Sequence, residues 1–284
     1  MKTVEFERPD GKKLNIEIIK YQIDDADRKK QADRHRHNFF SIHFILAGQS
    51  KQEIDFEDFE IKKNQIVLIP SGSVHWEKEN QDLSGYAILF KAEFFSPPQK
   101  ELLNGLLQYA IALRKLLIPI EEKAVQAIIY YFELLMKEQD NDLNQNQTFI
   151  LQNLMLALLN HLEGQIQKLP KSNSFVTTRR PFQRFIELVD HHYYEHQNLE
   201  FYAEHLQITK RKLSETVKSV TGQTAADYII ERITLEAKRE LCFNEKSVKE
   251  IAFQLGYESP YYFSRIFKKR TGLSPEQFRT TYAE

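Results

Sequence analysis

The feature that most constrains the fold of this 284-residue chain is a layout that occurs twice near its C-terminal end. Each copy, at 199–220 and at 248–269, is a short helical stretch, a tight turn and a longer helical stretch. This is the helix-turn-helix arrangement, in which the second helix lies in the major groove of DNA. The sequence therefore predicts an all-α C-terminal domain, over 179–284, with two helix-turn-helix motifs.

The two copies share their turn chemistry. Gly256 fits a helix C-terminus that requires a positive φ, and Ser259 followed by Pro260 fits the N-cap and first position of the next helix. Thr209 can cap the corresponding helix of the first copy. The run at 225–243 contains neither Gly nor Pro, so we expect one long helix that holds the motifs at a fixed separation. Positions that correspond in the two copies include Ala203 and Ala252, Leu206 and Leu255, Leu213 and Phe263, Val217 and Phe267, and Gly222 and Gly272. Ordinary helical hairpins are the plainer interpretation, but chance rarely produces two copies matched in this way.

The second copy also resembles a known family. The signature of the AraC/XylS family of transcription regulators is matched by Ser247-Val248-Lys249-Glu250-Ile251-Ala252, Gly256-Tyr257-Glu258-Ser259, Tyr262-Phe263-Ser264-Arg265-Ile266-Phe267-Lys268-Lys269, Gly272-Leu273-Ser274-Pro275 and Phe278-Arg279. The resemblance covers 181–284 and implies a sequence-specific regulator that binds double-stranded promoter DNA. It further implies a homodimer, a small-molecule effector bound in an N-terminal cupin-like domain and, for an activator, contact with RNA polymerase.

The N-terminal residues of a recognition helix face the base edges. In the second copy these positions are Pro260, Tyr261, Tyr262 and Arg265. Arg265 is the best candidate for a bidentate contact to guanine, and the tyrosines can contact thymine methyl groups or phosphates. Lys268 and Lys269 are candidates for phosphate contacts, with a solvated helix face as the alternative.

The matching positions of the first copy are Lys210, Arg211, Ser214 and Glu215. Arg211 is the best candidate there for reading a base. Glu215 repels phosphate, although a glutamate can accept a hydrogen bond from cytosine N4 or pair with Arg211 at i, i+4. We therefore expect the first copy to be the weaker reader.

Bulk charge gives no sign of a nucleic-acid partner. The chain has a net charge of −1, and residues 179–284 carry 17 Lys and Arg against 15 Asp and Glu. Affinity for DNA must therefore come from a local cluster of basic side chains and not from the net charge of the domain.

The first 95 residues have the pattern of a β domain. Stretches at 39–47, 66–69 and 85–90 are rich in β-branched and aromatic residues, and 54–61 alternates around a turn expected at Glu57-Asp58. Short strands at this spacing predict an antiparallel sandwich or barrel. The fold class we expect is multi-domain α+β: an N-terminal cupin-like β-barrel with appended helices (effector-binding domain, 1–95) and the all-α domain.

Residues 96–168 have helical periodicity and form the expected dimerisation region. One helix is expected after Pro97-Pro98, one around 124–135 and one around 151–162. The last of these carries an apolar stripe that is either core or dimer seam, and the family resemblance favours dimerisation. The stripe consists of Leu151, Leu154, Met155, Leu158 and Leu162. The Pro, Ser and Thr content of 169–178 indicates a linker.

Three N-terminal histidines raise the question of a metal site. Alternation along the strand puts His35 and His37 on one face, and a cupin would bring His75 near them. Metal-binding cupins place a glutamate shortly after the first pair, where this chain has Phe40 and Ser41. We therefore expect no metal, cofactor or catalytic residue, and a polar rim on an effector pocket instead. The residues expected at this pocket are His35, His37, Ser41, His43, His75 and Trp76.

The remaining features lead us to expect a cytoplasmic protein. Cys242 is the single cysteine, the N-terminus lacks the apolar region of a signal peptide, and no run of 18 apolar residues exists. Two other functions stay open. A metal-dependent cupin enzyme fused to a DNA-binding module would need a metal triad, and a signalling adaptor would leave the basic helix faces unused.

Overall fold

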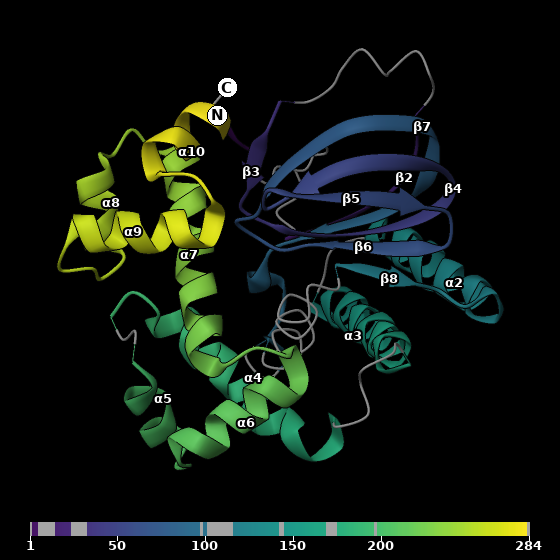
Figure 1. The fold of residues 1–284 in the computed structure, drawn as a ribbon. Coiled ribbons are helices and arrows are strands. Elements are labelled where there is room, and N and C mark those ends of the chain that lie inside the picture. Colours follow the sequence, from purple (N-terminus) through teal and green to yellow (C-terminus); the bar gives the residue numbers. More distant parts are fainter. Residues whose placement is uncertain are drawn as a thin grey trace. The chain divides into compact units, whose positions relative to one another are not determined.

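A computed structural model describes residues 2–4, 15–23, 33–96, 99–100, 116–141, 145–168, 175–195 and 198–282. The chain forms two compact units, residues 2–169 and 170–284 (Figure 1). Among the described residues, no helix combines the length and apolar content needed to cross a membrane.

The described strands of the first unit form one eight-stranded sheet. They are β1 (Lys2–Val4), β2 (Ile16–Ile23), β3 (His35–His37), β4 (Phe40–Ile54), β5 (Glu57–Lys62), β6 (Gln65–Ile69), β7 (Val74–Phe90) and β8 (Leu117–Pro119). The sheet order is β1-β3-β7-β4-β6-β8, with β2 also paired to β7 and β5 also paired to β4. A 3-10 turn, η2 (Ala92–Phe94), follows β7.

The long strands β4 and β7 organise this sheet by pairing antiparallel over almost their whole length. Their register shifts between Ile45 and Ala47 and again between Ala47 and Gln49. Gly48 lies within this region at a φ of 78°, where an added Cβ would come within 2.3 Å of the β7 backbone. Such bulges bend and twist the strands, so one end of β7 pairs with β2 and the other with β3.

The turn after β4 differs from the expectation. It falls at Asp55-Phe56, both with positive φ, rather than at Glu57-Asp58. The Asp55 carboxylate accepts hydrogen bonds from Ser73 Oγ at 2.9 Å and from the Val74 backbone N–H at 3.0 Å. A contact with a residue almost twenty positions away therefore selects the turn, and local sequence cannot reveal it.

The long helices in the described part of the first unit are α2 (Glu122–Gln139) and α3 (Gln145–Gln167). Phe132 of α2 stacks on Phe44 and Tyr86, which lie side by side on one face of the sheet. The α3 stripe expected as core or dimer seam is core at four positions, since Leu151, Met155, Leu158 and Leu162 are fully buried and only Leu154 is partly exposed. The helix expected after Pro97-Pro98 lies largely outside the described residues.

The second unit is all-α. Its helices are α4 (Phe175–His192), α5 (Leu199–His205), α6 (Lys210–Thr221), α7 (Ala225–Phe243), α8 (Val248–Gln254), α9 (Pro260–Thr271) and α10 (Pro275–Tyr282). The expected α+β class, a sheet domain with appended helices and an all-α domain with two helix-turn-helix motifs, is confirmed. Helix α4 begins at Phe175, inside the segment expected to be linker, so that segment is helical at its C-terminal end.

Candidate nucleic-acid interface

Both helix-turn-helix motifs have the caps that the sequence predicts. The Thr209 side chain accepts from the Lys212 backbone N–H at 3.1 Å, and Ser259 caps α9 with Pro260 at its start. Gly256 has a φ of 80°, as expected for a helix end. Caps of this kind satisfy backbone donors and acceptors that a short helix otherwise leaves exposed.

The duplication extends to the hydrogen bonds. In each motif the turn residue after the first helix donates its backbone N–H, at 3.0 Å, to the carbonyl of the small alanine at the helix crossing. In each, a threonine hydroxyl near the end of the second helix donates 2.9 Å back along that helix. The bonds are Ile208 to Ala203 and Tyr257 to Ala252, and Thr221 to Val217 and Thr271 to Phe267. Because these bonds occur at corresponding positions, α6 and α9 are attached to the rest of their motifs in the same way.

Helix α7 joins the two motifs within this unit (Figure 1). Its 19 residues span roughly 28 Å at 1.5 Å per residue. Arg270 of α9 forms an ion pair with Asp227 of α7, and Arg279 of α10 donates to the α7 carbonyl of Leu241 at 3.2 Å. These bonds fix the second motif to the long helix.

The exposed face of α9 carries aromatic and basic groups together. Tyr261 is 80% exposed and Tyr262 47%, while Phe263 and Phe267 are buried on the opposite side. The Arg265 guanidinium lies over the Tyr262 ring, 5.2 Å from its centroid. Pro260, Lys268 and Lys269 lie on the same helix, and both lysines are exposed. The predicted residues of the second motif are thus brought onto one short helix with their side chains accessible, apart from a half-buried Pro260.

Helix α6 differs, because acidic side chains engage its cations. Arg211 Nε lies 2.9 Å from Glu215 Oε1, which is the i, i+4 pair considered above. Lys210 Nζ lies 2.6 Å from Glu200 of α5, a partner that sequence spacing gave no reason to expect. Ser214 is half-buried on the same helix. The first motif therefore presents less uncompensated positive charge than the second.

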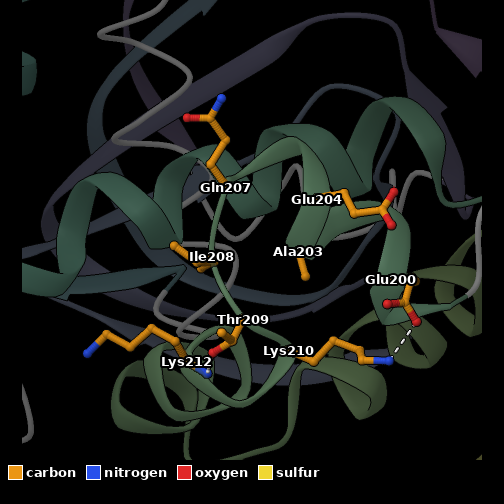
Figure 2. A pocket seen from close by; sticks show the side chains of 8 residues that line it. All are labelled: Glu200, Ala203, Glu204, Gln207, Ile208, Thr209, Lys210 and Lys212. Atoms are coloured by element: carbon orange, nitrogen blue, oxygen red, sulfur yellow. Dashed lines mark hydrogen bonds and ion pairs between the residues drawn. The ribbon is translucent and has the colours of Figure 1, made fainter.

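An open groove of about 680 Å³ lies at the α5–α6 turn. Figure 2 shows Glu200 and Lys210 joined by a dashed line, with the Lys212 side chain extending away from them. The groove is lined by Glu200, Ala203, Glu204, Gln207, Ile208, Thr209, Lys210 and Lys212. Acidic residues of α5 thus lie beside the cationic first turn of α6.

The histidines of the first unit do come together. His35 pairs in register with His75 across β3 and β7, and His37 is two positions along on the same strand face. The rings of His35 and His37 stack at 4.9 Å, and each lies edge-on to His75. Burial lowers the pKa of His37 to about 3 and that of His75 well below its ordinary value, with the neighbouring imidazoles adding to both shifts.

Other polar groups lie with this cluster. His75 Nε2 is 3.0 Å from Gln52 Oε1, and His43 Nε2 is 3.1 Å from Ser41 Oγ. Tyr21 packs edge-on to His43. Tyr21 and Gln52 do not stand out in the sequence, because their strands place them there only through long-range pairing. Burial lowers the pKa of His43 to about 4.

Trp76 does not join the other expected effector residues. It follows His75 directly in β7, and successive side chains of a strand point to opposite faces. Its ring is instead flanked by the Arg34 guanidinium at 4.5 Å and Lys78 Nζ at 5.0 Å, both of which pair with Glu53. Trp76 therefore lies apart from the histidine cluster, and a role for it in effector binding stays a prediction.

Two family models match the chain, one on each unit. Residues 21–96 match an AraC-like ligand binding domain, and residues 202–281 match a helix-turn-helix domain.

Relatives give the same picture. The transcriptional activator RhaS of Escherichia fergusonii is 23% identical over 262 residues, which cover 86% of each chain. Regulatory protein SoxS of Salmonella typhimurium is 34% identical over 34% of this chain and 91% of its own. An HTH-type regulator encoded in the cgkA 5' region of Pseudoalteromonas carrageenovora is 32% identical over 34% of this chain and 56% of its own. These relatives are regulators of transcription rather than enzymes. Both halves of the molecule thus lead to one conclusion: the chain belongs to the AraC/XylS family, as a DNA-binding transcription regulator with a ligand-binding domain.

Proposed function

We propose that α9 is the principal base-reading helix. The observation that carries this proposal is the placement of Arg265 and two exposed tyrosines on one face, opposite the buried Phe263 and Phe267. A guanidinium can form two parallel hydrogen bonds with guanine, and aromatic rings can contact thymine methyl groups or sugars. Lys268 and Lys269 follow within two turns and contact phosphates.

Helix α6 serves mainly to position the protein. Lys210, Arg211 and Ser214 contact DNA there, and Glu215 holds Arg211 in place at the cost of repelling nearby phosphates. With α7 as a spacer of roughly 28 Å, the two helices enter successive major-groove segments on one side of the duplex.

The first unit binds a small polar effector on the sheet face that carries Ser41, His43 and His75. Two buried polar atoms there, the Tyr21 hydroxyl and His37 Nδ1, have no hydrogen-bond partner. Unpartnered buried polar atoms are costly and are usually satisfied by water or a ligand. In this division residues 1–95 bind the effector, 96–168 dimerise, 169–178 connect and 179–284 bind DNA.

The regulator acts as a homodimer. In the described part of the first unit, the large exposed apolar side chains are Tyr130 and Leu134 of α2 and Phe149 and Ile150 of α3. Since these lie on two packed helices, a second copy can bury them together. As an activator, the dimer would bring RNA polymerase to the promoter.

Arg265→Ala tests the proposal. Sites are first selected from random duplexes by the full-length protein, and binding to the best site and to a scrambled one is then compared. We expect the variant to lose roughly 1–3 kcal/mol on the selected site and much less on the scrambled one.

Lys218→Ala is the matched control, because Lys218 is an exposed cation in the last turn of α6. Its loss should be small and nearly equal on both sequences. Equal losses for Arg265→Ala on the two sequences would contradict base reading by this residue.

A further inference from the structure

Three imidazoles lie close enough in the first unit to bind one ion. Each of His35, His37 and His75 offers a ring nitrogen, and these nitrogens all lie within 4.8 Å of one another. Nitrogens bound to one zinc ion at 2.0–2.1 Å in tetrahedral geometry are about 3.3 Å apart. Side-chain rotations that shift each nitrogen by about 1 Å are enough to close this difference.

The backbone holds the three side chains in this arrangement. His35 is paired with His75 across β3 and β7, and β3 is itself paired with β1 on its other side. His37 and His75 are only 5% and 4% exposed. A site carried by paired strands is positioned before any ion arrives, so binding requires little ordering.

Hydrogen bonds around the cluster leave a lone pair on one ring nitrogen of His35 and on one of His75. The carbonyl of Asp33, 2.9 Å from His35 Nδ1, can only accept, so that nitrogen carries the proton and Nε2 is left as a ligand. By the same argument, Gln52 Oε1 fixes the proton of His75 on Nε2 and leaves Nδ1. His37 Nδ1 is buried without any hydrogen-bond partner. Metal-binding histidines typically have such outer partners.

The donor set also suits a metal, because each of the three side chains is an imidazole. The carboxylate of Asp55, whose charge acts on His37, accepts hydrogen bonds from Ser73 Oγ and the Val74 backbone N–H, and Glu53 is paired with Arg34 and Lys78. The donor set is therefore three imidazole nitrogens without a carboxylate.

We propose that His35, His37 and His75 form a binding site for a divalent first-row transition-metal ion such as Zn²⁺, Co²⁺ or Ni²⁺. Three nitrogen donors suit these ions and not Mg²⁺ or Ca²⁺, which require oxygen. The glutamate expected of metal-binding cupins is missing, but three histidines with one open position are themselves a known zinc arrangement. The open position is available to water or to a donor atom of an effector. Metal binding does not depend on the regulatory function proposed above.

Co²⁺ titration of the full-length protein tests this site. The protein carries no histidine tag and is first stripped with EDTA and dialysed. Visible absorption then reports four- or five-coordinate Co²⁺, and added Zn²⁺ should abolish that absorption at one equivalent per chain. We expect His37→Gln and His35→Gln each to weaken Co²⁺ binding by at least about tenfold.

His161→Gln is the matched control, because it removes a half-exposed histidine of α3 that lies outside both the triad and the proposed effector site. It should bind Co²⁺ like the unaltered chain. Circular dichroism checks that each variant is folded, and if His37→Gln does not fold, the variant of the half-exposed His35 still tests the site. Fewer than one bound ion per unaltered chain, or equal binding by His35→Gln and His161→Gln, would overturn the site. DNA binding is measured on the same samples, so that loss of the metal site and failure of the regulatory proposal can be told apart.

Discussion

Arg265 and Glu215 occupy the same position in the two helix-turn-helix motifs, fifty residues apart. In α9 that position places a cation over an aromatic ring, and in α6 it places a carboxylate beside Arg211. The two motifs therefore have matched hydrogen bonds but opposite charge at a position that we propose faces DNA. Exposed ion pairs contribute little stability, so we expect the Arg211–Glu215 pair to affect DNA binding more than folding.

Glu215→Gln should strengthen DNA binding. The change removes a charge that repels phosphate and releases Arg211. We therefore expect roughly threefold tighter binding at low salt. The slope of the logarithm of the binding constant against the logarithm of the salt concentration should also become steeper by about one. Fluorescence anisotropy with a labelled duplex over a range of salt concentrations measures both.

Glu60→Gln makes the same change of net charge on the exposed face of β5, in the other unit. It should leave affinity and salt dependence unaltered. If Glu215→Gln behaved like this control, Glu215 would not lie near the bound phosphates.

At the scale of elements, local signals predicted the helical half well. Thr209, Ser259 and Gly256 each fix a helix end through bonds to near neighbours, which is why their roles are readable from sequence. The Asp55 turn is set by Ser73 and Val74, and the Trp76 ring packs against Arg34. Such long-range partners leave no local mark, and for that reason the sheet domain and its histidine cluster were predicted less completely.

The α3 stripe shows a related limit. Its leucines have the same spacing whether they face a core or a second copy, because periodicity identifies a face and not its partner. Burial shows that Leu151, Met155, Leu158 and Leu162 pack inside the unit.

An ion-pair network joins α4 to α7 in the second unit. Arg232 lies 2.9 Å from Asp190 and 3.1 Å from Glu236, and its guanidinium covers the Tyr193 ring at 4.3 Å. Arg232→Ala leaves both carboxylates without this partner in a largely buried place. We expect the free energy of unfolding of the second unit to fall by about 2–4 kcal/mol, measured by urea denaturation.

Arg184→Ala, on the exposed side of α4, should change the free energy of unfolding by less than about 0.5 kcal/mol. Equal stability of the two variants would contradict a structural role for the Arg232 network.

At the scale of the whole molecule, the proposed dimer depends on the burial of apolar side chains that are exposed in the single chain. Ile150→Glu places a charge on the α2–α3 surface, where Ile150 is 44% exposed. Because burying an unpaired charge is costly, we expect the variant to dissociate at concentrations at which the unaltered chain is dimeric. Sedimentation equilibrium over a range of concentrations measures this.

Phe253→Glu is the control, since Phe253 is similarly exposed but lies on α8 of the other unit. It should remain dimeric. A monomeric unaltered chain, or equal behaviour of the two variants, would contradict dimerisation through α2 and α3.

The central claim is that one chain contacts two successive major-groove segments with two helices, α6 and α9, held apart by α7. Methylation-interference mapping on a selected site, repeated with Arg211→Ala and Arg265→Ala, tests it most directly. We predict two clusters of major-groove contacts per chain about 10 base pairs apart, with Arg265→Ala weakening one cluster and Arg211→Ala the other. A single cluster per chain, or two clusters at variable spacing, would contradict it.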